Sequence, residues 1–196
     1  MRVRQTKVTV VTPRKKYLGV LSSSKVHLRT SDLLNNPNLF PRYHDQTRLE
    51  NALRLHNATE LIDGRIRYKR HDHIDIMICN IIFFYDEHES LGNAAERERA
   101  KKALEQQKAL QPESVKSHLT IDTSIYGNSF FEIRGVFFGR FRNLMKQNFV
   151  SLTNAKVKEK IIGNNEDELS SLPYKIKNSF VAVNTSHIAS YSIRQI

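Results

Sequence analysis

Basic side chains gather in several short stretches of the sequence, and their spacing could bring positive charge to one surface. Thirty-one lysines and arginines against twenty aspartates and glutamates give a formal net charge of +11. Such a charge attracts anionic partners, which include RNA, DNA, acidic proteins and phospholipid surfaces. Alternate residues of a strand point to the same side, so Arg65, Arg67 and Lys69 could follow a line of phosphates. A solvated strand face without a ligand is the alternative explanation. The candidate residues for nucleic-acid or anionic-partner binding are Arg14, Lys15, Lys16, Arg65, Arg67, Lys69, Arg70, His71, Arg140, Arg142 and Lys146.

Two histidines in the same region raise the question of a metal site. His71 and His73 are two residues apart, so a strand would place both imidazoles on one face, and His44 or His56 could add a ligand. A metal site requires three or four converging ligands, and the neighbouring arginines and lysines would repel a cation. We therefore expect neither a metal site nor a bound cofactor.

Residue patterns that carry catalysis are missing from the sequence. It contains no glycine-rich phosphate loop, no Gly-x-Ser-x-Gly motif and no pair of acidic residues in an apolar context. Ser186 and His187 are adjacent, and adjacent residues of a strand point to opposite faces. We therefore expect no catalytic residue and predict that the protein is not an enzyme.

The single cysteine, Cys79, bears on the cellular compartment. It lies in an apolar run over residues 74–84 and has no second cysteine with which to form an internal disulfide, which fits a reducing cytosol. Its apolar surroundings predict a buried side chain. The sequence begins without the apolar core of a signal peptide and contains no run of about 18 apolar residues. We expect a soluble, cytoplasmic protein with no membrane span.

The elements that would carry these residues occur in two related portions of the chain. Leu53–Thr59 reads LRLHNAT and Val150–Lys156 reads VSLTNAK, and each segment follows a glycine in a strand-like pattern, Gly19 or Gly135. A long period with two copies indicates a duplicated domain. A unit of about 80 residues buries little more than ~60% of its unfolded surface, so we expect the two copies to pack together.

Short runs of β-branched and aromatic residues between turn residues predict strands throughout both portions. A single helical turn is expected over Ser31–Asn35, and the helix-forming residues 91–111 predict a solvated connecting helix that ends before Pro112. The predicted strands are residues 8–11, 17–21, 53–55, 61–68 and 73–85 in the first portion and 119–121, 130–136, 149–152, 156–162, 180–183 and 188–193 in the second.

Glycines and asparagines at matching places have predicted structural roles. A glycine inside a strand, as at Gly19 and Gly135, usually marks a bulge or a sharp bend. Asn57 and Asn154 are each expected between two strands, in turns held by bonds from the side chain to the backbone. Asn80 and Asn184, which close the two apolar runs, are expected to make the same kind of bond from side chain to backbone.

The same residues carry a family resemblance. A glycine-containing strand, the segment Ser31–Asn35 and the ending Phe180–Ile188, which reads FVAVNTSHI, are similar to a bacterial family of small β domains of unknown function, here in tandem. The strand order of that family is similar to Sm-like small barrels. The first portion lacks the histidine of the ending, and the second has Asn143 where the first has Asp32. The resemblance implies a fold and brings no established activity.

The sequence thus predicts a mainly β protein with one charged connecting helix and two related small curved sheets or barrels. The predicted organisation is a first β repeat over 1–85, a charged helical linker over 86–117 and a second β repeat over 118–196. We expect a non-enzymatic structural or adaptor subunit of a larger cytoplasmic assembly that binds a protein partner through its β-domain surfaces. The alternative is RNA binding through the basic strand face, and self-association of the chain is left open.

Overall fold

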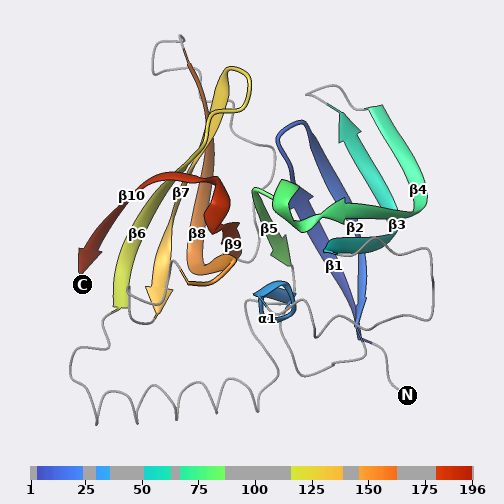
Figure 1. Cartoon of the computed structure of the whole chain (residues 1–196), viewed down its shortest axis with the longest axis horizontal. Helices are drawn as coiled ribbons and strands as arrows, with labels where there is room; N and C mark the ends of the chain where they lie inside the picture. The colour runs from blue at the N-terminus through green and yellow to red at the C-terminus, as the bar shows by residue number, and fades with distance from the viewer. Residues whose placement is uncertain are drawn as a thin grey trace.

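The computed structural model shows a mainly β protein whose strands form one antiparallel sheet (Figure 1). It describes residues 4–23, 30–35, 51–62, 67–86, 116–138, 146–162 and 180–195. The described strands are β1 (Arg4–Val11), β2 (Lys15–Ser23), β3 (Ala52–Ile62), β4 (Arg67–Met77), β5 (Phe83–Asp86), β6 (Lys116–Thr123), β7 (Ser129–Phe138), β8 (Phe149–Ile161), β9 (Val181–Asn184) and β10 (Ile188–Gln195). One short helix, α1 (Thr30–Asn35), and two 3-10 turns, η2 (Ile78–Asn80) and η3 (Thr185–His187), complete the described elements.

The sheet consists of two units with the same internal order of strands. The order is β10-β6-β7-β8-β9-β5-β1-β2-β3-β4, so β1 to β5 form a first unit and β6 to β10 a second. Within each unit the fifth strand pairs with the first and lies at one end of the unit. The fourth strand lies at the opposite end. The two units join where β9 pairs with β5. The described strands leave the sheet open, with β10 and β4 as its end strands.

The predicted domain boundaries fall inside strands. β5 continues to Asp86, one residue beyond the predicted end of the first repeat, and β6 already begins at Lys116. The predicted connecting helix over 91–111 lies outside the described residues. Within the described ranges, no helix is long and apolar enough to cross a lipid bilayer.

The predicted bulges at the two strand glycines are confirmed. The pairing of β2 with β3 shifts between Leu18 and Val20, and that of β7 with β8 shifts between Arg134 and Val136. At Gly19 an added Cβ would lie 2.8 Å from the Cβ of Leu55, and at Gly135 it would lie 2.8 Å from the Cβ of Leu152. Glycine is therefore required because the neighbouring strand leaves no room for a side chain.

Asn57 and Asn154 do not lie in turns between strands, so that prediction is wrong. β3 and β8 continue through these residues, and each asparagine has a positive φ, 47° for Asn57 and 51° for Asn154. Each is the extra residue that its strand carries at the bulge. Asparagine is one of the few side chains that tolerates the left-handed region, so it can bend a strand without ending it.

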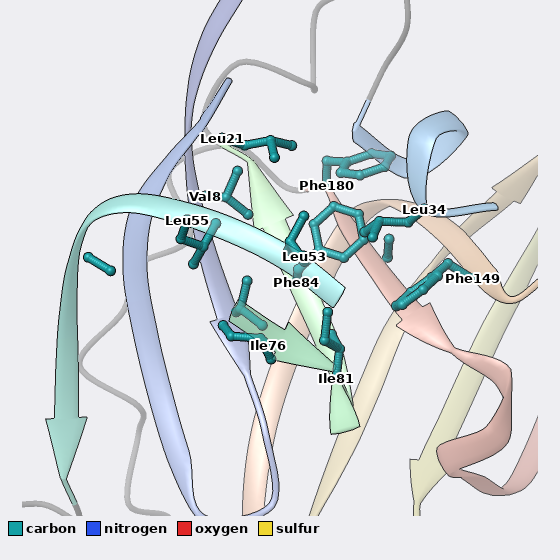
Figure 2. Close-up of a cluster of buried hydrophobic side chains, with 13 residues drawn as sticks. Val8, Leu21, Leu34, Leu53, Leu55, Ile76, Ile81, Phe84, Phe149 and Phe180 are labelled. Atoms are coloured by element: carbon teal, nitrogen blue, oxygen red, sulfur yellow. The ribbon is translucent and has the colours of Figure 1, made fainter. Parts of the chain in front are cut away.

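Two hydrophobic cores lie on either side of the junction between the units. All five strands of the first unit contribute to one core, which shows that the sheet curls around it (Figure 2). Phe149, Phe180 and Ala182 of the second portion enter this core as well. The other core belongs mainly to the second unit, and Val11 and Phe83 of the first unit enter it. Each core therefore needs residues from both halves of the chain.

The apolar run over residues 73–85 is not one strand, which corrects the sequence prediction. β4 ends at Met77, η2 turns the chain, and β5 begins at Phe83. In β5 and β9 nearly every side chain is buried, because the first core covers one face and the second core covers the other. Burial on both faces explains why these strands are almost continuously apolar.

The predicted single helical turn is present as α1, and it contacts the second unit. The Asn35 side chain accepts a hydrogen bond from the Phe149 amide at 2.7 Å and donates one to the Phe149 carbonyl at 3.1 Å. Thr30 donates a hydrogen bond to the buried Asp86 at 3.0 Å. The Asn35 bonds hold α1 against the start of β8, the Thr30 bond ties it to the end of β5, and Leu34 enters the first core.

Candidate functional site

Two of the predicted basic residues meet at a buried carboxylate. The side chain of Glu60 in β3 is only 4% exposed, and Lys15 and His71 approach its two oxygens, at 2.6 Å and 3.1 Å. Lys15 begins β2 and His71 lies in β4, so the three residues come from three adjacent strands. Both side chains are engaged by Glu60, which reduces what they can offer to an anionic ligand.

The electrostatics of this cluster favour an ionised Glu60. The hydrogen bond from Lys15 lowers the pKa of Glu60 below its ordinary value, against the raising effect of burial, and His71 lowers it further. The same hydrogen bond raises the pKa of Lys15. Burial raises the pKa of the adjacent Tyr17. A paired carboxylate with a lowered pKa is a weak base at neutral pH, so the arrangement suits a structural ion cluster.

The second unit holds a comparable cluster at another position. Glu132 in β7 lies 2.9 Å from the ammonium of Lys160 and 3.0 Å from Nε of Arg134. Burial raises the pKa of Glu132, but the hydrogen bond from Lys160 and the adjacent Arg134 guanidinium outweigh it and leave the pKa below its ordinary value. This cluster also neutralises positive charge inside the protein.

The remaining predicted basic residues do not gather on a single described face. Lys16 lies 3.8 Å from Glu159 of β8 in the other unit. Arg14 is exposed at the turn between β1 and β2, Lys69 and Arg70 are exposed on β4, and Lys146 is exposed before β8. Arg67 lies in β4, with its side chain outside the described part, and Arg65, Arg140 and Arg142 lie outside the described residues altogether.

Two of the histidines considered as metal ligands lie opposite each other on adjacent strands, and a third contacts a carboxylate. His71 contacts Glu60, whereas His73 lies opposite His56 in the pairing of β4 with β3. Among the residues whose positions the structure gives, no three His, Cys, Asp or Glu side chains come together to hold a metal ion. His44 lies outside those residues.

Cys79 is exposed, which corrects the prediction of a buried side chain. It lies in the turn η2 at the surface, where the chain leaves β4 for β5. Its carbonyl accepts a hydrogen bond from Nε2 of His187 at 2.6 Å, and Nδ1 of His187 contacts the hydroxyl of Tyr126. His187 lies in the turn η3 and not in a strand, and it links the two 3-10 turns to each other.

A shallow groove lies over the bulge of the first unit. It has a volume of about 240 Å³, and its lining includes Leu18, Gly19 and Asn57. Lys7 is its single titratable lining residue, so the groove offers little chemistry to a ligand.

The strand β10 is an exposed end strand of the sheet, which the sequence patterns did not indicate. Its side chains from Ser190 to Arg194 are exposed, including Tyr191 at 42% and Ile193 at 39%. The corresponding strand of the first unit, β5, is almost completely buried between two cores. Tyr191 and Ile193 are two residues apart, so the alternation predicts a strand, but only the strand order shows that this strand ends the sheet.

Comparison of the chain with protein-family models, with curated proteins and with solved structures yields no match.

Proposed function

We propose that the protein is a non-enzymatic structural or adaptor subunit of a larger assembly, and that it binds a protein partner through the outer edge of β10. One observation carries the proposal. The side chains of β10 from Ser190 to Arg194 are exposed, whereas the equivalent strand β5 has its edge paired with β9 and nearly all its side chains buried by the two cores.

The outer edge of β10, with which no described strand pairs, suits a protein partner for a simple physical reason. The outer edge of a strand presents backbone N–H and C=O groups, to which an extended segment of a partner can add as a further strand. Exposed apolar side chains such as Tyr191 and Ile193 then add contact area. Native edge strands commonly carry lysine or proline to prevent pairing, and β10 carries neither.

The proposal includes a tandem duplication of a small β domain, in line with the family resemblance and the Sm-like order of strands. Three features support this origin. The two units share one strand order. Each has a bulge at a glycine, Gly19 or Gly135, that packs against a leucine. Each also has an asparagine with positive φ at that bulge, Asn57 or Asn154.

The test is capture of partners by the tagged full-length protein from its own cells. We expect the wild-type chain to retain a stoichiometric partner and Ile193→Lys to reduce the retained amount at least about tenfold, because pairing would desolvate the new charge. The control is Ile162→Lys, which makes the same change at a side chain that is 50% exposed after β8. A wild-type chain that elutes alone would contradict the proposal.

RNA binding is the second candidate, and the net charge of +11 together with the exposed Arg14, Lys69 and Arg70 favours it. Affinity for a mixed-sequence single-stranded RNA should then fall steeply with salt. Replacing Lys69 or Arg70 by alanine should each lower the slope of log K against log salt by roughly one unit. Lack of binding at low salt would eliminate this candidate.

A further inference from the structure

The junction between the two units shows how one unit can dock on another. There the fourth strand of the second unit, β9, pairs antiparallel with the fifth strand of the first unit, β5. Phe83 lies opposite Val183, and Phe84 lies opposite Ala182. Both faces of this pair are covered, and the four side chains are at most 1% exposed.

The end strands of the sheet are the equivalents of these two strands. β10 corresponds to β5, because each is the fifth strand of its unit and pairs with the first, Phe84 opposite Val10 and Tyr191 opposite Ile121. β4 likewise corresponds to β9, because each is the fourth strand of its unit and ends in a 3-10 turn.

The two turns fix the correspondence of β4 and β9 residue by residue. Met77 precedes η2 with φ −58° and ψ 129°, and Asn184 precedes η3 with φ −72° and ψ 123°. Ile81 and Ile188 follow the turns, and both have φ −81° with ψ values that differ by one degree. Met77 therefore corresponds to Asn184.

The molecule thus presents, at opposite ends of its sheet, the two strand edges whose equivalents already pair inside it. We propose that a second copy of this chain docks its β4 antiparallel on β10, as β9 docks on β5. This inference rests on the proposed function, because it names the partner of the β10 edge.

The internal junction also specifies the register of the proposed contact. Transferring it residue by residue places Ser190 opposite Ile76 and Tyr191 opposite Asp75. Continued along the strands, the same register places Arg194 opposite Asp72, and both of these side chains are exposed. Opposite charges at directly opposed positions stabilise a strand pair, so the charges fit this register.

The contact uses a different surface on each copy, so it can be repeated from chain to chain. Such a contact produces a closed ring when the rotation closes and a filament when it does not. In both cases the mass in solution exceeds that of one chain.

The first experiment is light scattering on the purified full-length chain, with charge reversal at the predicted pair. We expect an oligomer that Arg194→Asp and Asp72→Arg each weaken at least about tenfold, because like charges then face each other. The double variant should restore assembly, since it re-forms an opposite pair. A monomeric wild-type chain, or a double variant as weak as the single variants, would overturn the inference.

The second experiment measures the register with engineered cysteines in a Cys79→Ser background, which removes the native thiol. A mixture of Arg194→Cys and Asp72→Cys chains should form a disulfide-linked dimer on oxidation, because opposed Cα atoms in a strand pair lie within disulfide range. In the control, Arg194→Cys chains are mixed with Lys69→Cys chains, whose cysteine lies at an exposed site of β4 three residues from Asp72. This pair should form little disulfide-linked dimer. Equal linking of both pairs would overturn the register.

These outcomes separate the inference from the proposed function. A monomeric chain that still loses a captured partner through Ile193→Lys refutes docking of a second copy and leaves the β10 edge as a partner site. An oligomer that the Arg194 and Asp72 variants leave intact refutes the inference too, because its contact then lies elsewhere.

Discussion

At the scale of single residues, the basic side chains of this protein are divided between internal ion clusters and the surface. Lys15 and His71, which the sequence suggested as ligands for anions, hold the buried carboxylate of Glu60. A buried carboxylate without partners would be strongly destabilising, so the cluster matters to the fold. The positive charge that is left for a partner lies at dispersed positions.

Glu60 should make the protein sensitive to acid. Because its pKa is lowered in the folded state, its ionised form contributes stability above the ordinary pKa of 4.5, and that contribution is lost as pH falls through the lower folded value. Urea unfolding between pH 7 and pH 3 should show a smaller loss of stability in Glu60→Gln than in the wild type.

Lys15→Met is the matched partner variant, because it removes the largest cause of the lowered pKa. It should also flatten the decline of stability in acid. An unchanged pH dependence in both variants would show that Glu60 titrates alike in the folded and unfolded chains.

At the scale of elements, the 3-10 turns connect the two units. The side chain of Asn184 donates hydrogen bonds to the carbonyls of Ile78 and Ile81 and accepts them from the amide and hydroxyl of Ser186. Asn80 is exposed and makes a single contact, at 3.9 Å, with the Cys79 thiol. The predicted bond from side chain to backbone is confirmed at Asn184, whereas the matching of Asn80 with Asn184 is wrong, because Asn184 corresponds to Met77.

Asn184→Ala should therefore destabilise the protein strongly. It removes the partner of the Ile81 carbonyl and the cap of η3, which should lower the free energy of unfolding by about 2–4 kcal/mol. Asn80→Ala is the control and should change that free energy by less than about 0.5 kcal/mol. Chemical denaturation of both variants measures the difference, and equal losses would contradict the assigned roles.

Local patterns predicted much of the fold. The strands and the bulges at Gly19 and Gly135 follow from apolar runs and from glycines inside them. The turn η2 was missed because Ile78 and Cys79 continue an apolar run, and a 3-10 turn needs no polar residue. The edge at β10 could not be predicted, because the position of a strand in a sheet depends on pairings between distant segments.

At the scale of the whole molecule, the two units behave as one structure because each core contains residues of the other half. Phe149 packs edge to face on Phe84 in the first core, and Phe83 packs in the same way on Phe131 in the second. Loss of either unit would uncover one face of the β5 and β9 pair. The junction thus couples the stability of the two units.

Thermal unfolding should accordingly be a single transition, even when one core is weakened. Leu119→Ala in the second core and Leu55→Ala in the first should each cost about 2–5 kcal/mol and lower Tm by about 2–4 °C per kcal/mol. Scanning calorimetry should show one peak in each variant. Two separated peaks in Leu119→Ala would show that the units unfold independently.

The shared cores also affect how the chain folds as it leaves the ribosome. When β5 has been made, the first core still lacks Phe149, Phe180 and Ala182, the last of which follows almost a hundred residues later. At about 5–20 residues per second, the nascent first half waits roughly 5–20 s with apolar surface uncovered. A chaperone that shields nascent chains during this interval should raise the yield of native protein.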